Sequence, residues 1–218
     1  MIGCWKHGMI QAALLFDMSG VLLDFDLQSL KERVAVASGV PLSDIDRTWR
    51  DDPYSQSERG EVTSREFYRH YADRLRLAWS YERWVAEWAR IVTRNEDGTR
   101  LFAALRTAGR PAYVLSNFAG HHRDAVGAAV PGFWGASSGN FLSYELGVCK
   151  PDPTIFEACC ASIGLPPRQC YFFDDDEANV SGAAAVGLWA LRFSDENMPA
   201  IRRAVQPYLA PALRGAGS

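Results

Sequence analysis

Residues 14–23 read LLFDMSGVLL, and this stretch decides the fold. An apolar run rises to a single acid, Asp17, and the pattern then breaks at Ser19-Gly20 before it becomes apolar again. Such a pattern is typical of a buried parallel strand that delivers a carboxylate to its C-terminal end and then turns sharply. A carboxylate among Leu and Phe is costly to bury unless a cation meets it. We therefore expect Asp17 to be a nucleophile with a cationic partner elsewhere in the chain.

The composition of the whole chain is that of a soluble globular protein. Its 218 residues are 48% hydrophobic and 22% charged, which is enough apolar material for a sizeable core. A formal net charge of -3, with scattered arginines, argues against a nucleic-acid partner. The N-terminal apolar run is too short for a signal peptide or a membrane span, so we expect no membrane partner and a cytoplasmic location. Residues 1–9 are expected to be a loose extension and residues 212–218 a frayed tail.

The cysteines predict neither a disulfide framework nor a zinc site. An odd number in a chain of this length, with no CxxC pair and no His at zinc spacing, is typical of reduced and mostly buried thiols. The five cysteines are Cys4, Cys149, Cys159, Cys160 and Cys170.

Hydrophobic periodicity divides the chain into two parts. Residues 25–95 show four helical patterns in succession, with a loop before residue 64 and no strand signal. The four patterns cover residues 27–38, 42–49, 64–75 and 81–92. We predict an inserted helical domain over residues 25–95 and a core domain made of residues 10–24 and 96–218.

Outside the insert, short strand patterns alternate with helical ones. This alternation predicts an α/β fold in which helices cover both faces of a doubly wound parallel sheet. The ligand site of such a fold lies at the C-terminal ends of the strands. The predicted strands cover residues 12–16, 112–115, 141–142, 170–173 and 188–193.

The strongest polar signals stand where the predicted strands end. Because parallel strands end at one rim of a sheet, these distant side chains are expected to meet in one pocket. Carboxylates of Asp17 and Asp175 suit Mg²⁺, which prefers oxygen ligands in an octahedron. The strand-end residues are Asp17, Ser116, Asn117, Asp174 and Asp175.

Lys150 is the expected cationic partner of Asp17. It is one of only three lysines in the chain and stands in a loop just before a helix. An ammonium group there would offset the charge of the nucleophile and bind a phosphoryl oxygen.

Two other groups of conspicuous side chains have a structural explanation. Tyr68, Tyr71, Trp84 and Trp88 lie at helical spacing and are expected to form the core of the insert. The adjacent histidines at positions 121 and 122 point about 100° apart on a helix. We therefore expect them to form a solvated helix start and not a metal pair.

Four segments, taken in order, resemble the four motifs of the haloacid dehalogenase-like (HAD) hydrolase superfamily, and the helical insert is similar to its C1-type cap. The four segments are FDMSGVL (16–22), LSN (115–117), GVCKPDPTIF (147–156) and FFDDDEANVSGAAAVG (172–187). ERGEVTSREFYRHY in the insert and the FFDDDEAN form of the last motif further resemble the bacterial glucose-1-phosphatase branch and the phosphatase domain of soluble epoxide hydrolase. The resemblance implies a Rossmann-like core with an inserted cap.

The resemblance also implies a role for each matching residue. Asp17 would attack phosphorus in line and become an aspartyl phosphate. Ser116 and the Asn117 amide would hydrogen-bond the phosphoryl group, and Lys150 would neutralise its charge. The Mg²⁺ ligands would come from Asp17, the backbone carbonyl of Ser19, Asp174, Asp175 and Asn179. The implied activity is Mg²⁺-dependent hydrolysis of a small phosphorylated metabolite, a sugar phosphate-like monoester, by a monomer or homodimer.

Ser19 departs from the family pattern. The phosphatases usually have Asp at this position, which protonates the leaving oxygen and then activates water, whereas serine does not titrate near neutral pH. Losing general acid–base help costs on the order of a hundredfold to ten-thousandfold in rate. One alternative is therefore a weakened or inactive relative that binds a phosphorylated ligand or a protein partner. Another is a metal-free 2-haloacid dehalogenase, which the resemblance disfavours because that group has Tyr where this chain has Ser19.

Overall fold

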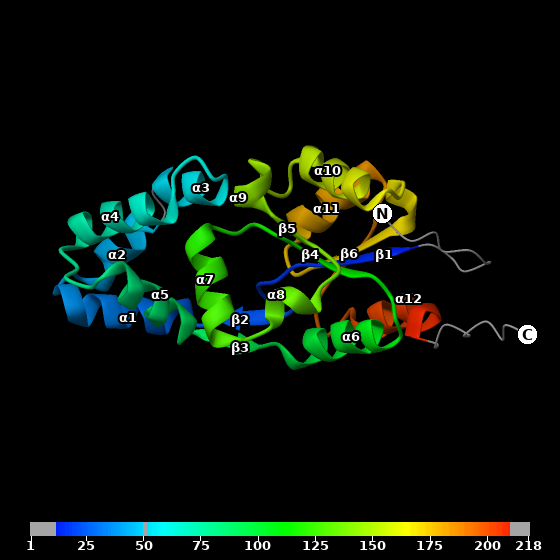
Figure 1. The fold of residues 1–218 in the computed structure, drawn as a ribbon, viewed down its shortest axis with the longest axis horizontal. Coiled ribbons are helices and arrows are strands. Elements are labelled where there is room, and N and C mark those ends of the chain that lie inside the picture. Colours follow the sequence, from blue (N-terminus) through cyan, green and yellow to red (C-terminus); the bar gives the residue numbers. More distant parts are fainter. Residues whose placement is uncertain (1–11, 50–51, 210–218) are drawn as a thin grey trace, which may run out of the picture.

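Five parallel strands form the central sheet, in the order β5-β4-β1-β6-β7 (Figure 1). The computed structural model describes residues 12–49 and 52–209, and the predicted terminal extensions at 1–9 and 212–218 lie outside this part. The strands confirm the predicted positions and the predicted α/β class. They are β1 (Ala13–Phe16), β4 (Ala112–Ser116), β5 (Asn140–Leu142), β6 (Cys170–Asp174) and β7 (Trp189–Arg192).

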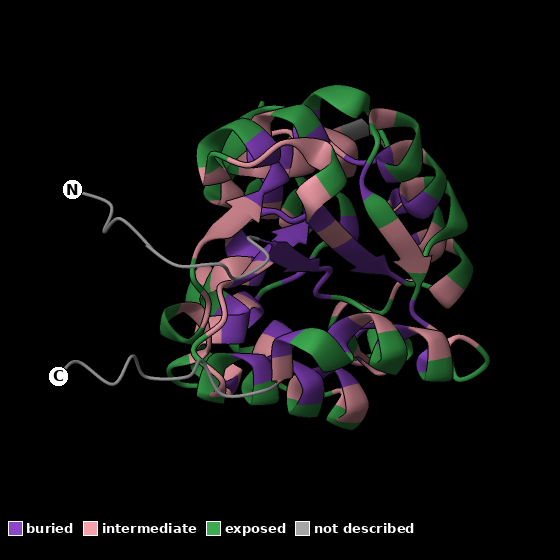
Figure 2. Ribbon diagram, turned by 90° about the vertical axis from the view of Figure 1, so that its right-hand side faces the viewer, coloured by how far each residue is buried: buried purple, intermediate pink, exposed green. Residues whose placement is uncertain are grey.

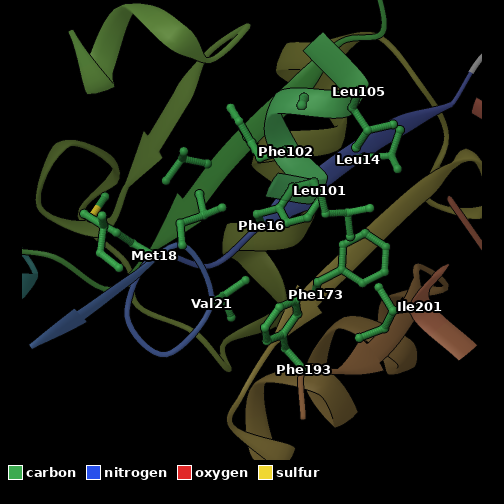
Figure 3. Packing of buried hydrophobic residues seen from close by; sticks show 14 of the residues in the cluster. Leu14, Phe16, Met18, Val21, Leu101, Phe102, Leu105, Phe173, Phe193 and Ile201 are labelled. Carbon is green, nitrogen blue, oxygen red and sulfur yellow. The ribbon is translucent and has the colours of Figure 1, made fainter. Parts of the chain in front are cut away.

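Alternate side chains of β1 enter two separate cores, one on each face of the sheet. Leu14 and Phe16 pack with α6 (Glu96–Thr107) and α12 (Met198–Leu209), as Figure 3 shows for one part of this cluster. Ala13 and Leu15 pack on the other face with α10 (Pro153–Ile163) and α11 (Glu177–Val186). All four residues of β1 are completely buried, which explains why the first strand has no polar position before Asp17. The strand β1 therefore lies between two layers of helices whose outer sides are exposed (Figure 2).

Five helices, not the predicted four, form the described part of the insert. The additional helix is α3, which replaces most of the predicted loop before residue 64. Pro53 stands in its first turn, where the missing N–H is tolerated, and Tyr54 packs edge-on against Phe67 with ring centroids 6.0 Å apart. The helices are α1 (Leu27–Ser38), α2 (Leu42–Thr48), α3 (Asp52–Glu58), α4 (Ser64–Leu75) and α5 (Tyr81–Ala89).

A two-stranded antiparallel ribbon carries the chain into and out of the insert. It pairs β2 (Leu23–Phe25) with β3 (Val92–Arg94), and Asp24 lies opposite Thr93. The prediction of no strand in residues 25–95 was wrong for this ribbon, because three-residue strands are too short to show an alternating pattern. The insert therefore joins the core through two adjacent chain segments.

Aromatic side chains fill the interior of the insert, as predicted. Tyr71, Trp84 and Trp88 are almost completely buried, and Tyr68 is partly buried against their cluster. The ring centroids of Trp84 and Trp88 lie 5.9 Å apart in an edge-to-face arrangement. These residues form the core of the insert, and Trp88 also borders the pocket described below.

The remaining elements connect the sheet with the insert. Helix α7 (Gly120–Ala129) packs against α5 of the insert, while α8 (Phe133–Ala136), α9 (Ser143–Leu146) and a 3-10 turn (Pro167–Gln169) complete the loops. The four cysteines of the described residues are free thiols, as expected, and Cys4 lies outside this part. Among residues 12–49 and 52–209, each helix is too short or too polar to cross a bilayer.

Candidate active site

A sharp turn after β1 brings Asp17 to the rim of the sheet. The backbone N–H of Asp17 still donates to the carbonyl of Phe173 at 2.8 Å, so the residue continues the strand pairing. Gly20 then adopts a left-handed conformation with φ of 71°. A Cβ atom at Gly20 would stand 2.4 Å from Asp175 Oδ2, so a glycine is required for the turn to approach that acid. The Ser19-Gly20 break in the sequence pattern is thus the element that places Asp17 beside Asp175.

Lys150 is buried between two carboxylates. Its Nζ lies 2.9 Å from Asp17 Oδ1 and 2.6 Å from Asp174 Oδ2, and it also donates to the carbonyl of Leu115 at 3.3 Å. Only 1% of its side chain is exposed. The structure therefore places beside Asp17 the lysine that was expected there, and adds Asp174 as its second partner.

Burial and charge act against each other on this cluster. Burial raises the pKa of Asp17 to about 6, which Lys150 and a hydrogen bond from Ser116 oppose and the charge of Asp174 reinforces. Burial also disfavours the ammonium form of Lys150, but Asp17 and Asp174 outweigh it and hold the pKa of Lys150 above its ordinary value. One buried cation thus faces more negative charge than it neutralises.

Two asparagines position these charged groups. Asn117 clamps the backbone of Lys150, donating from Nδ2 to its carbonyl at 2.9 Å and accepting from its N–H at 2.7 Å. Asn179 donates from Nδ2 to both oxygens of Asp174, at 3.1 and 3.2 Å. The structure therefore gives both side chains positioning contacts, and their roles toward phosphate and metal stay predictions.

The acids at this rim fit a divalent cation. Asp17, Asp174 and Asp175 each offer a carboxylate oxygen, and these three atoms lie within 4.8 Å of one another. Burial and the charge of Asp174 raise the pKa of Asp175, and Asp17 Oδ1 is buried without an aligned hydrogen bond. Three carboxylates with one lysine leave two negative charges, and oxygen donors are what Mg²⁺ prefers. The residues present therefore fit Mg²⁺, most directly through Asp17 and Asp175.

A pocket of about 160 Å³ lies over this rim, between the core and the insert. Its walls are mainly aromatic and aliphatic, and no Lys or Arg is among its lining residues in the described part of the chain. Ser19 and Asn117 come from the core, and Glu58 comes from α3 of the insert. The lining residues are Ser19, Phe25, Leu27, Tyr54, Glu58, Trp88, Asn117, Phe118 and His122.

Glu58 is the residue of this pocket that sequence reasoning missed. Burial raises its pKa to about 7, against the lowering effect of Lys150 and Arg59, and the charge of Asp17 adds to the rise. The sequence offered one signal, because Glu58 opens the ERGEVT segment that carried the resemblance in the insert. That signal did not show that the side chain lies over the site.

The prediction of solvent-exposed histidines at the start of α7 was wrong. His121 and His122 are buried, because the insert covers α7 on the side that faces away from the sheet. The ring of His121 stacks on Phe67 with centroids 4.8 Å apart, and the His122 ring contacts Trp88 at 4.4 Å. Burial lowers the pKa of His122 to about 3. Both rings are therefore neutral, and His122 accepts from the N–H of Ala119 through Nδ1 at 3.3 Å.

This burial makes stability depend on pH in a defined direction. Because the pKa of His122 is lower in the folded protein than in the unfolded chain, its contribution is present above the unfolded pKa of about 6.5 and is lost as pH falls. At pH 5.0, protonation of this residue stabilises the unfolded chain relative to the folded protein by about 2 kcal/mol. We expect His122→Phe to become more stable relative to wild type by about this amount between pH 7.5 and 5.0, as measured by urea unfolding. An unchanged difference between the two proteins would contradict the neutral, buried state.

Comparisons with known proteins place the chain in one family. Residues 11–187 match the model of the haloacid dehalogenase-like hydrolases. A phosphatase of Mycobacterium tuberculosis is 25% identical over 194 residues, covering 82% of this chain and 85% of the relative. Mouse Acyl-CoA dehydrogenase family member 10 is 24% identical over 205 residues; the match covers 86% of this chain, which spans only 18% of that protein.

A solved structure of similar fold holds a metal ion and phosphate. It is a HAD family enzyme of Bacteroides thetaiotaomicron in complex with magnesium and inorganic phosphate, with a TM-score of 0.74 and 25% identity over 84% of this chain and 94% of that one. The family match extends over most of the chain and includes β1, β4, β6 and the loop of Lys150. The chain therefore belongs to the haloacid dehalogenase-like hydrolases.

Proposed function

We propose that this protein is a Mg²⁺-dependent phosphohydrolase that acts on a small phosphate monoester through an aspartyl phosphate on Asp17. The observation that carries the proposal is the contact of buried Asp17 with buried Lys150, next to two further acids at the same rim. A phosphatase relative and a structural neighbour that holds magnesium and phosphate support it. The glucose-1-phosphatase branch and a sugar phosphate substrate stay predictions.

Each residue at the rim has its own role in the reaction. Asp17 Oδ attacks phosphorus as the nucleophile, which converts one difficult displacement into two easier ones. Lys150 offsets the charge on Asp17 and on the phosphoryl oxygens, and Asn117 holds the lysine in place through its backbone. Ser116, buried at the end of β4, donates toward the transferred group. Water then displaces Asp17 from phosphorus and releases inorganic phosphate.

The metal would be held by Asp17, Asp175 and the backbone carbonyl of Ser19. When bound, Mg²⁺ supplies positive charge that neutralises the phosphate oxygens and orients them for in-line attack. Asp174 has an indirect role in this arrangement, because its carboxylate already accepts hydrogen bonds from Lys150, Asn179 and the N–H of Asp176.

The pocket indicates what kind of alcohol leaves. A second anionic group on the substrate would face aromatic walls and the carboxyl group of Glu58, with no cationic side chain among the lining residues described. Burying an unpaired charge is costly. We therefore expect an uncharged leaving group of modest size, and expect phosphate esters that carry a carboxylate to be poor substrates.

Phosphate release from a panel of esters tests the proposed function. The panel contains sugar phosphates, glycerol phosphate and p-nitrophenyl phosphate, each assayed with Mg²⁺ and with EDTA. We expect turnover with Mg²⁺ that EDTA abolishes. If no ester is hydrolysed with Mg²⁺, the proposal fails.

A binding protein is the second candidate function, favoured by Ser19 at the position where an acid–base group is expected. In that case calorimetry would detect phosphate binding in the presence of Mg²⁺ although no ester is turned over. Haloacid dehalogenation finds no support in the pocket, because none of its described lining residues is a cation that would pair with the substrate carboxylate. Release of chloride from 2-chloropropionate would support dehalogenation.

A further inference from the structure

The proposed reaction lacks an evident proton donor in the core. The leaving oxygen needs a proton when the ester bond breaks, and Ser19 carries no group that titrates near neutral pH. The insert supplies a candidate for this proton donor. Ser19 and Glu58 line the same space, and Glu58 is the one carboxylate among its described lining residues.

The carboxyl group of Glu58 is not engaged by the described residues around it. Within residues 12–49 and 52–209 it has no hydrogen bond and no ion pair, although the charges of Lys150, Arg59 and Asp17 all act on it. Burial raises its pKa to about 7, so both protonation states are populated at neutral pH. A group that must first give a proton and then take one works best with such a pKa.

The core holds the backbone of Glu58 in place even though the residue belongs to the insert. Ser143 Oγ donates to the carbonyl of Glu58 at 2.6 Å and accepts from the N–H of Phe118 at 2.8 Å. Two residues further on, Gly60 has a φ of 69°, and a Cβ atom there would lie 2.2 Å from the carbonyl oxygen of Tyr144. This close approach and the Ser143 hydrogen bonds fix the end of α3 over the rim.

We propose that Glu58 is the general acid and base of this site, supplied by the insert in place of the titratable side chain that the core lacks at Ser19. The inference rests on the proposed function and specifies which residue moves its proton. It assigns a catalytic role to the end of α3, which lines the pocket.

The proton balance of the two steps follows from this assignment. In the first step, Asp17 Oδ bonds to phosphorus, the bond from phosphorus to the ester oxygen breaks, and the carboxyl proton of Glu58 passes to that oxygen to give the free alcohol. In the second, a water oxygen bonds to phosphorus, the bond to Asp17 breaks, and a proton of the water passes to the Glu58 carboxylate. The net change is ester plus water to alcohol plus phosphate, with both side chains restored.

Glu58→Gln tests the inference, because glutamine keeps the size of the side chain and removes its acidity. With glycerol phosphate, whose leaving group is a poor alkoxide, kcat should fall on the order of a hundredfold to ten-thousandfold. With p-nitrophenyl phosphate, whose phenolate leaves without a proton, the rate of p-nitrophenolate release in the first turnover should change little, although steady-state turnover falls because the attack of water still needs the Glu58 base. A purely structural role for Glu58 would slow the first turnover of both esters alike.

Two further variants sharpen the result. Glu32→Gln, an exposed glutamate on α1 of the same insert, should leave both rates unchanged. Ser19→Asp in the Glu58→Gln background should recover turnover of glycerol phosphate, because it restores an acid on the core side of the pocket. Recovery of this kind supports an acid–base role, since packing damage would not be repaired from another residue.

The outcomes separate this inference from the proposed function. An equal loss in the first-turnover rate of both esters, or no loss on either, overturns the role of Glu58, while Mg²⁺-dependent turnover by the wild type still supports the hydrolase. A wild type that cleaves p-nitrophenyl phosphate but never glycerol phosphate also overturns it, since no donor would then serve the leaving oxygen. If the wild type hydrolyses neither ester, both proposals fail.

Discussion

Asp17→Asn is expected to lower phosphate release by at least about a thousandfold, since the amide has no lone pair of comparable nucleophilicity to form the phosphoenzyme bond. The variant should remain folded, because asparagine preserves the shape and removes a charge that burial disfavours, as the rise of the Asp17 pKa to about 6 indicates. Turnover and thermal unfolding, measured on the same preparation, check both statements.

Asp24→Asn provides the matched control for this change. Asp24 lies close to the first motif, on β2, but its side chain is exposed and its carboxylate accepts a long hydrogen bond from Asn95, at 3.4 Å. We expect full activity in this variant. Comparable turnover in Asp17→Asn and wild type would show that another group carries the nucleophilic step.

Lys150→Met is expected to lower the free energy of unfolding by about 3–5 kcal/mol at pH 7, measured by urea unfolding in EDTA so that no added cation compensates. The ammonium group is nearly inaccessible and lies within 3 Å of carboxylates of both Asp17 and Asp174. Its removal leaves two buried carboxylates without a cation, which costs more than the loss of the contact itself. Phosphatase activity should be lost as well.

The surface lysine of the insert supplies the control. Lys31 pairs with Asp46, but 23% of the lysine side chain and 43% of the aspartate side chain are exposed. Lys31→Met should therefore cost no more than about 1 kcal/mol. A loss of similar size in the two lysine variants would mean that the buried cluster is no more dependent on its cation than a surface pair.

The core and its rim were predictable because local patterns determine them. The apolar run before Asp17 has no polar position, as is typical of a strand buried on both faces, and Ser116 and Asp174 stand at the ends of further buried strands. Lys150 was identifiable because lysines are rare in this chain and this one follows a loop into a helix. What the pattern could not show is that Asp174, and not Asp175, would be the partner of that lysine.

The part of the pocket that α3 supplies was not predictable in the same way. Helix α3 is seven residues long, and its packing depends on Phe67 of α4 and on Ser143 of the core, which are distant in sequence. The histidines of α7 were expected to be exposed because one face of a helix usually meets solvent, but here the insert covers that face. Both differences arise from contacts between elements that are distant in sequence, which hydrophobic periodicity within a single segment does not encode.

The β2–β3 ribbon has a consequence for how proteins of this architecture diversify. The chain leaves the core after Leu22 and returns at Asn95, and the N–H of Asn95 donates to the carbonyl of Leu22 at 3.1 Å. The two junctions are thus adjacent, so a segment of another length or sequence placed between them need not redirect any strand of the main sheet. Under the proposed function, the insert could therefore change, and with it the leaving group that the pocket accepts, while Asp17, Lys150 and Asp175 stay in place.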